Sequence, residues 1–402
     1  MIKFFNPQKL VIFIVFCLFS INIYSANRYW VANAASNWNN TANWSTVNGG
    51  LGGASVPVAG DFVYFNNNGL GNCTLDVNAG FDGININVAY TGILELAGFA
   101  FNPSISNGAS VCTFGGGTIN DTPATSSVSF TTTTNVYFSG TTFNTPIVAT
   151  GSIAFNGGIY NSPVTVINDY NNLNGIGGCT FNSTLHVTNI NTNYFLMGYT
   201  NPDIFNADVT FINTSSSRIR IAYNSIGTQF NGNIIVGSNN GSGVWIGESA
   251  TSSSTIAAGG TISVAPLGFS IGELRFSGFT QSGATPQSLS LSGTAILRFH
   301  LNSTFNGPLN MDAPQIFIAG STFMSAADIE KTGAGNNSST GGNLFNANTI
   351  ISNSGSGYFL MGNGDPDSCI ANFTMNNLGT YNMYFAYNSL NNYVGGNLTV
   401  NN

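Results

Sequence analysis

The sequence predicts an all-β chain folded as a right-handed parallel β-helix, in which short strands wind around one axis. Three observations lead to this prediction: a long internal repeat, a shorter repeat of coil length inside it, and the lack of any sustained helical period. Gly and Asn separate the short apolar runs and supply the positive φ angles that tight turns need. We therefore expect an extended stack rather than a compact globule.

The long repeat is visible as two motifs that each occur twice with the same spacing. The motif YFLMG at 194–198 returns at 358–362, and the motif AYNS at 222–225 returns at 386–389, so both have an offset of 164 positions. Over the 45 positions from 194 to 238, the two copies share 17 identities without an insertion or deletion. The sequence therefore predicts a duplicated block of several coils, with one copy at about 142–304 and a partial second copy at 305–402.

The shorter repeat consists of an aromatic residue, an Asn, two turn residues and then alternating aliphatic residues. Its copies begin at Phe143, Tyr160, Phe181, Phe205, Phe230, Phe305 and Phe345. The first five starts are separated by 17, 21, 24 and 25 positions, which is the length of one solenoid coil. We predict that the aromatic side chains point inward and that the Asn side chains bond to one another along the axis. At roughly 22 residues per coil, residues 76–402 would form about 15 coils and a rod on the order of 70 Å long.

The segment 1–26 has the features of a secretory signal peptide. Lys3 and Lys9 precede a short apolar run from Leu10 to Phe19, and the stretch from Ser20 to Ala26 that follows has small residues near its end. An uncleaved membrane anchor is the alternative, although the run is short for a stable bilayer span. No second long apolar run follows, so we expect a secreted or cell-surface chain with no transmembrane segment in its mature part.

Charge is scarce in this chain and its balance is acidic. Asp, Glu, Lys and Arg make up 6% of the residues, against roughly 25% in ordinary soluble domains. Because two of the eight basic residues lie in the signal peptide, the formal charge of the mature chain is −7 − 2 = −9. This argues against nucleic acids and anionic lipid surfaces as partners, because both attract basic patches. A content of 43% apolar and 12% aromatic residues is enough to form a core.

Residues 27–75 are predicted to cap the N-terminal end of the stack. They contain Trp30, Trp38 and Trp44, three of the four tryptophans. An open stack would expose the unpaired backbone groups of its terminal strand, so the terminal units of solenoids are atypical. Large aromatic side chains can cover that first layer. The alternative is that these tryptophans stack on sugar rings.

The segment from Trp30 to Phe65 contains the strings SNWNNTANWS and VPVAGDFVYF. It resembles the opening segment of exported bacterial parallel β-helix and autotransporter-like, adhesin-type surface proteins, especially those of the Bacteroidetes. The remainder of the chain is similar to these proteins only in style. The resemblance implies a β-helical fold and a surface location, and it suggests type IX secretion as the export route.

No catalytic, cofactor-binding or metal-binding residue is predicted. Enzymes that act on polysaccharides need clustered acids, or a basic residue beside calcium-binding acids, on adjacent coils, whereas the acids of this chain are scattered. The densest group, Asp365-Pro366-Asp367, is interpreted as a turn rather than a calcium site. His186 and His300 are interpreted as structural residues.

The remaining polar candidates are also interpreted as structural. Arg218 and Arg220 alternate on one predicted strand face, but Asn and Tyr take their places in the second copy. Arg275 and Arg298 are interpreted as isolated, and Glu330-Lys331 as an exposed loop pair.

Two further groups leave alternatives open. The repeated YFLMG motif, with Tyr194, Phe195 and Met197, is either a binding surface or core packing, and packing is favoured. The four cysteines of the mature chain are expected to be core residues, with a Cys73–Cys112 disulfide as the alternative.

These observations predict a non-enzymatic structural or adhesin-like rod that binds glycans or other surface components. The alternative is a carbohydrate-active β-helix enzyme, which three or more charged groups on neighbouring coils of one face would favour. A third possibility is a passive spacer for a domain beyond residue 402. Because the sequence stops in the middle of a repeat, we expect it to be the N-terminal piece of a longer protein.

Overall fold

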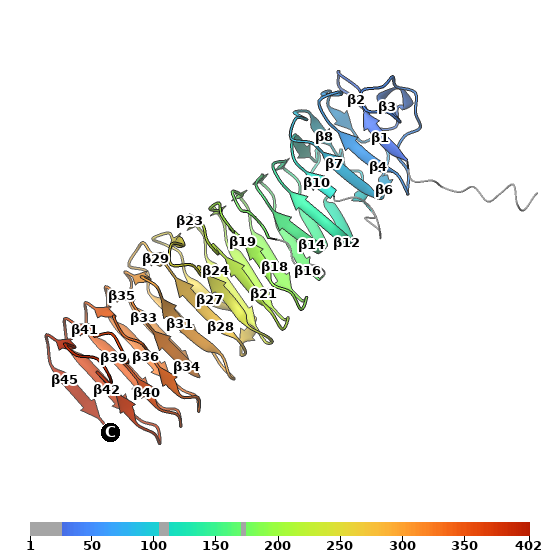
Figure 1. Cartoon of the computed structure of the whole chain (residues 1–402). Coiled ribbons are helices and arrows are strands. Elements are labelled where there is room, and N and C mark those ends of the chain that lie inside the picture. The colour runs from blue at the N-terminus through green and yellow to red at the C-terminus, as the bar shows by residue number, and fades with distance from the viewer. Residues whose placement is uncertain (1–25, 104–111, 170–173) are drawn as a thin grey trace, which may run out of the picture.

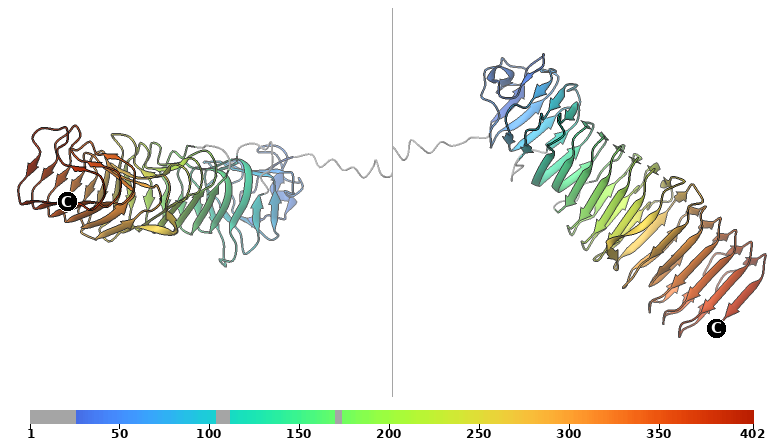
Figure 2. Two further views of the ribbon diagram at one scale, coloured as in Figure 1. Left: turned by 90° about the horizontal axis from the view of Figure 1, so that it is seen from below. Right: turned by 180° about the vertical axis from the view of Figure 1, so that it is seen from behind.

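The computed structural model of this chain describes residues 26–103, 112–169 and 174–402. These residues form a long β-solenoid, which confirms the predicted parallel β-helix (Figure 1). The only helix in these ranges is the 3-10 turn η1 (Thr41–Asn43). Figure 2 shows from two further sides that the strands stack along one axis, from the N-terminal end in blue to the C-terminal end in red. The predicted signal peptide lies outside the described residues, apart from Ala26.

From β18 onward, each coil adds one strand to each of three faces. The first face begins in a sheet whose members, in the described residues, are β1 (Asn27–Trp30), β3 (Trp44–Ser45), β4 (Phe62–Phe65), β6 (Ala79–Phe81), β7 (Gly83–Ile86), β9 (Phe101–Pro103), β10 (Cys112–Phe114), β12 (Val128–Phe138), β14 (Ile147–Phe155), β16 (Val164–Asn168), β18 (Leu185–Asn189), β21 (Val209–Asn213), β24 (Ile234–Ser238) and β27 (Ile262–Phe269). A second sheet continues this face with β30 (Gln287–Ser290), β33 (Leu309–Ala313), β36 (Ala327–Lys331), β39 (Thr349–Asn353), β42 (Phe373–Asn377) and β45 (Leu398–Asn401).

The second face consists of shorter sheets. Its strands are β19 (Phe195–Met197), β22 (Arg218–Ile221), β25 (Gly243–Ile246), β28 (Glu273–Ser277), β31 (Ile296–His300) and β34 (Gln315–Ile318), followed by β37 (Asn337–Ser338), β40 (Phe359–Leu360) and β43 (Met383–Tyr384). Its first six strands pair only in parallel with the coil before and the coil after. Outward side chains at matching positions therefore form rows along the axis of the solenoid.

The third face is one sheet along the whole described rod. Its strands are β2 (Ser36–Asn37), β5 (Cys73–Thr74), β8 (Ile93–Glu95), β11 (Thr118–Asn120), β13 (Thr142–Phe143), β15 (Ile159–Tyr160), β17 (Thr180–Phe181), β20 (Ile204–Phe205), β23 (Ile226–Phe230), β26 (Ser253–Ile256), β29 (Phe279–Gln281), β32 (Thr304–Phe305), β35 (Thr322–Phe323), β38 (Leu344–Phe345), β41 (Ser368–Cys369) and β44 (Tyr393–Val394). Most of these strands have only two or three residues, because the chain turns into the next face soon after it enters this one.

The third face carries the aromatic residue and the Asn of the shorter repeat, as predicted. Its inward aromatic side chains stack: the ring centres of Tyr160 and Phe181 are 4.5 Å apart, and those of Phe181 and Phe205 are 5.3 Å apart. The following Asn side chains point outward, and each donates to the Asn of the preceding coil at 2.6–2.7 Å. This ladder joins Asn120, Asn144, Asn161, Asn182, Asn206 and Asn231. Aliphatic and further aromatic side chains of the other two faces fill the rest of the core.

The N-terminal segment closes the stack as predicted. Strand β3 pairs antiparallel with β1 and so covers the edge that β1 would otherwise expose. Trp30, Trp38 and Trp44 are at most 1% exposed, and the rings of Trp38 and Trp44 meet edge to face with centres 4.8 Å apart. Since their faces are buried, the alternative that they stack on sugar rings is wrong.

The two copies of the YFLMG motif have the same local structure. Gly198 and Gly362 have φ angles of 64° and 63°, in the left-handed region that favours glycine. Phe195 and Met197 are at most 2% exposed, as are their counterparts Phe359 and Met361. Core packing therefore explains the phenylalanine and the methionine of the motif. The described part of the chain contains no helix long and apolar enough to cross a membrane.

A candidate binding site on the second face

Four of the six Lys and Arg residues that follow residue 26 lie on the outer side of the second face. In the strand register, Arg220 is followed by Trp245, Arg275, Arg298 and Phe317 on successive coils. The neighbouring inward residues of these strands are fully buried, and this fixes which side chains point outward. We call the set Arg218, Arg220, Trp245, Glu248, Glu273, Arg275 and Arg298 the arginine face.

Trp245 lies between two guanidinium groups. The guanidinium carbon of Arg218 is 3.7 Å from the centre of the Trp245 ring, and that of Arg275 is 3.5 Å from it. The two arginines come from the coils on either side of Trp245, so each covers one face of the ring. A cation over a tryptophan face is attracted by the quadrupole of the ring. Trp245 thus holds two long, flexible cations in fixed positions.

The two carboxylates near this tryptophan are paired with arginines. One oxygen of Glu273, Oε1, accepts from Nε of Arg275 and lies 3.1 Å from Nε of Arg298. The carboxylate oxygen Oε2 of Glu248 lies 3.3 Å from Nε of Arg220. Among the described residues, Arg218 forms no ion pair. Burial lowers the pKa of Arg218, and the nearby charge of Arg220 lowers this pKa further.

The charge of the arginine face is opposite to that of the rest of the chain. Four arginines and the two paired glutamates give +4 − 2 = +2. The other residues after position 26 have two basic and thirteen acidic side chains, which gives +2 − 13 = −11. Anionic molecules that meet this acidic rod are therefore attracted to one place on it.

Aromatic side chains border the arginine face. The guanidinium carbon of Arg220 lies 4.7 Å from the ring centre of Tyr194 and 5.3 Å from that of Tyr223. Tyr223 in turn stacks on the exposed Tyr199, with ring centres 5.4 Å apart. At the end of the arginine face nearer the C-terminus, the guanidinium carbon of Arg298 lies 4.3 Å from the ring centre of Phe317. The result is a surface with aromatic borders that extends over several coils.

The structure overturns one interpretation of the sequence here. Arg275 and Arg298 were expected to be isolated, but parallel pairing of β28 with β31 places them side by side. Trp245 and Glu273 were not singled out by the sequence. The criterion of three or more charged groups on neighbouring coils of one face is met by this site.

The two histidines lie in different places. His300 is on the same strand as Arg298, and burial, followed by the charges of Arg275 and Arg298, lowers its pKa. With Asn302 and Asp365 it lines a hollow of about 230 Å³ at the end of this strand. His186 lies on the first face, where its Nε2 is 3.2 Å from the hydroxyl of Thr188.

The Asp365-Pro366-Asp367 segment is a turn with one buried acid. Asp365 is exposed, whereas Asp367 is fully buried and accepts from the backbone N–H of Asn343 at 3.0 Å and from its side chain at 2.9 Å. Asp203, its counterpart in the first copy, accepts from the backbone N–H of Cys179 at 3.0 Å. Burial raises the pKa of Asp203 to about 7. In the described ranges no group of three or more His, Cys, Asp or Glu side chains could hold a metal ion.

The structure corrects the interpretation of Glu330-Lys331 as an exposed pair. Lys331 is fully buried and ends β36 at a position that Asn353 occupies in the next coil. Its ammonium donates to the carbonyls of Gly333 and Gly357 and to the side chain of Asn353. Burial lowers the pKa of Lys331. The buried ammonium therefore stabilises the turn after β36 by hydrogen bonds to backbone carbonyls inside the coil.

The four described cysteines are free thiols in the core, so the Cys73–Cys112 disulfide does not form. Burial raises the pKa of each thiol. They are therefore poor candidates for nucleophiles.

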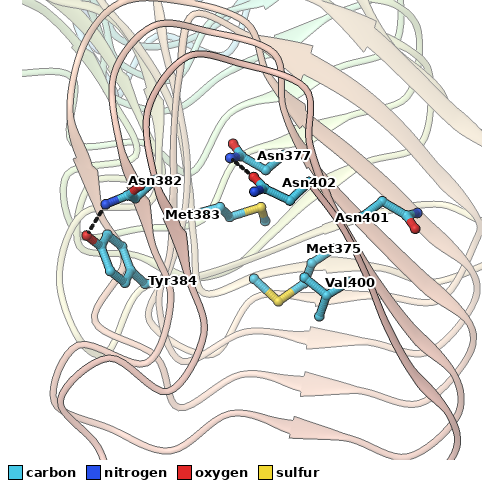
Figure 3. Close-up of a pocket in the computed structure, with 8 residues that line it drawn as sticks. All are labelled: Met375, Asn377, Asn382, Met383, Tyr384, Val400, Asn401 and Asn402. Atoms are coloured by element: carbon cyan, nitrogen blue, oxygen red, sulfur yellow. Dashed lines mark hydrogen bonds between the residues drawn. The ribbon is translucent and has the colours of Figure 1, made fainter.

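A hollow of about 290 Å³ lies at the last coil of the described chain (Figure 3). Met375, Met383 and Val400 form its apolar side. Asn377 donates to Asn402 at 2.7 Å, and Asn382 donates to the hydroxyl of Tyr384 at 2.6 Å. Val400 is 62% exposed, although its register partner Met375 is 5% exposed. The hollow thus consists of core positions of the solenoid seen end-on.

Comparison with known proteins gives no relative. No protein-family description matches this chain, and neither a curated protein nor a solved structure is significantly similar to it.

Proposed function

We propose that this chain is a non-enzymatic, adhesin-like rod, secreted or held at the cell surface, that binds glycans through the arginine face. The features of a signal peptide in the segment 1–26 support export, and the resemblance of the opening segment supports a place among exported bacterial surface proteins. The observation that carries the proposal is the row of Arg220, Trp245, Arg275 and Arg298 on successive coils.

A row of this kind suits a long, polar ligand. Neighbouring coils are about 4.8 Å apart, so groups at matching positions repeat at that interval along the rod. Each guanidinium offers several donors in a fixed plane, and the tyrosines at the edge add hydroxyl groups and ring faces. A row of side chains that extends over several coils is suited to an extended glycan chain, whereas a small molecule is usually bound in a compact pocket.

The second candidate is a carbohydrate-active enzyme, because charged groups do gather on neighbouring coils. A hydrolase would need two carboxylates with different roles, one of them available to donate a proton. Glu273 and Glu248 are each paired with an arginine. This pairing favours binding over catalysis.

The experiment that tests the proposal uses the purified protein and a panel of immobilised polysaccharides. We expect retention on at least one of them, reduced in the Arg275→Gln variant. The same mixtures are assayed for new reducing ends and for unsaturated uronates. Retention without cleavage supports a binding protein, cleavage supports the enzyme, and the lack of retention on every polysaccharide contradicts the proposal.

A further inference from the structure

The pairing of Glu273 shows that the arginine face already binds a carboxylate. Oε1 of Glu273 lies between Nε of Arg275 on its own strand and Nε of Arg298 on the next coil. The Glu273 side chain is 11% exposed, whereas those of Arg275 and Arg298 are 17% and 25% exposed. Two cations thus converge on one carboxylate oxygen and remain accessible from outside.

We propose that Arg275 and Arg298 form a recognition site for the acidic groups of a polysaccharide, and that Glu273 occupies this site when no ligand is bound. The ligand class is a linear glycan with carboxylate or sulfate groups at short intervals. This inference rests on the proposed function, since it names which glycans the arginine face binds.

Charge and geometry both support an acidic ligand. Arg218, across the Trp245 ring from Arg275, has no ion pair among the described residues and is therefore available to a second acidic group of the same chain. Guanidinium groups bind carboxylates and sulfates through paired N–H donors. A neutral glycan would leave the two excess positive charges of the face without partners.

The faces of Trp245 are not available to a sugar ring. Both are covered by guanidinium groups, at 3.7 Å and 3.5 Å. The stacking of sugars on aromatic rings, by which neutral glycans are commonly held, is therefore blocked at the centre of the site. Trp245 acts as a positioning residue that keeps Arg218 and Arg275 apart and extended.

Glu273 gives the inference its sharpest test. In the Glu273→Gln variant the internal competitor loses its charge, so an acidic glycan should bind about three- to tenfold more tightly. In Arg298→Gln, binding should weaken about tenfold, and Arg298→Lys should restore it only in part because lysine lacks the planar fork. Arg28→Gln removes the same charge within the N-terminal cap, far along the rod from the arginine face, and should leave binding unchanged.

The measurement is titration of the purified protein and each variant with polygalacturonate, dextran sulfate and neutral dextran. Ionic strength is set at about 50 mM and about 500 mM, since salt weakens contacts between exposed charges. Circular dichroism and the thermal midpoint establish that each variant is folded. We expect binding of the acidic polymers, weaker at high salt, and the comparison of carboxylated with sulfated polymer identifies the preferred group.

The outcomes separate this inference from the proposed function. Binding of dextran alone, or binding that Arg298→Gln and Glu273→Gln leave unchanged, overturns the inference while the glycan-binding function stands. Binding to none of the polymers or other glycans overturns both. If Glu273→Gln instead abolishes cleavage of an acidic polymer, Glu273 is a catalytic group and the assignment as an internal competitor is wrong.

Discussion

The guanidinium of Arg275 lies 3.5 Å from the centre of the Trp245 ring, on the face opposite Arg218. The two residues are direct partners in the parallel pairing of β25 with β28. Regular stacking of coils therefore brings together side chains that are a full coil apart in the chain. Because the contact depends on this register, it links the stability of the second face to the geometry of the candidate site.

Replacement of Trp245 should lower the stability of the protein and weaken the binding of an acidic glycan. We expect Trp245→Ala to lower the free energy of unfolding by about 1–3 kcal/mol, because a partly buried ring loses two cation–π contacts. Trp245→Phe keeps a ring face and should cost less. The measurement is urea denaturation followed by circular dichroism, together with binding of an acidic glycan. Equal stability of the Ala and Phe variants would show that the sandwich contributes little.

The aromatic stack and the Asn ladder could be predicted from the sequence because both follow a short motif that recurs at coil length. Phe205 and Asn206 are adjacent in the chain, so one points inward and the other outward in each copy. The same argument explains where the ladder ends. After Asn231 the equivalent positions carry Ala257 and Ser282, which cannot continue it.

A break inside the ladder should cost stability. Asn182 donates to Asn161 and accepts from Asn206, both at 2.7 Å. We expect Asn182→Ala to destabilise the protein by about 1 kcal/mol, since both bonds are exposed to water. The matched control is Asn346→Ala, whose side chain donates only to the sulfur of Met324 among the described residues and should matter less.

Asn182→Asp provides a second test of the ladder. An aspartate can still accept from Asn206 but, when ionised, cannot donate to Asn161 and faces its carbonyl oxygen. We expect a larger loss than in the Ala variant at neutral pH, with partial recovery at a pH below about 4, where the carboxyl is protonated. A loss that is independent of pH would contradict the donor–acceptor order of the ladder. Urea midpoints at the two pH values measure it.

The arginine face could not be predicted because its period is irregular. The steps from Arg220 to Trp245, Arg275 and Arg298 span 25, 30 and 23 positions. The longest step contains β27, an eight-residue strand with a register shift opposite Val236 to Ser238. Such insertions hide which residues share a row. The burial of Lys331 could not be predicted for a related reason. A Glu-Lys pair in the sequence does not show which of its two side chains points into the core at the end of a strand.

Stability should fall as the pH rises from about 4 to about 7. The pKa of the Asp203 carboxyl is raised from 3.8 to about 7 by burial, so the folded state holds this proton more tightly than the unfolded state. The contribution is therefore complete below about pH 4 and is lost as the pH passes through 7. For one carboxyl it amounts to about 4 kcal/mol.

The Asp203→Asn variant isolates this effect. An amide cannot ionise, so the difference in unfolding free energy between the parent and the variant should shrink at low pH and grow in favour of the variant toward neutral pH. The measurement is a series of urea midpoints between about pH 4 and about pH 8. Burial raises the pKa of Asp367 in the second copy as well, so the double variant should have the flattest profile. Parallel profiles for parent and variants would show that neither carboxyl is protonated in the folded state.

The N-terminal cap should protect the coils next to it more than distant ones. The ring of Trp38 is 1% exposed and contacts Trp44 and Phe81, with ring centres 4.8 Å and 5.8 Å away. We expect Trp38→Ala to lower the unfolding free energy of the cap and the coils next to it by about 3–5 kcal/mol, because a large cavity opens in the first layer of the core. Each coil contacts mainly its neighbours, so the loss should fade along the rod. Hydrogen exchange should show faster amide exchange in β4 and β5 and unchanged exchange in β39 and β42. Uniform acceleration along the whole rod would mean that the solenoid unfolds as a single unit and that the cap is not a local device.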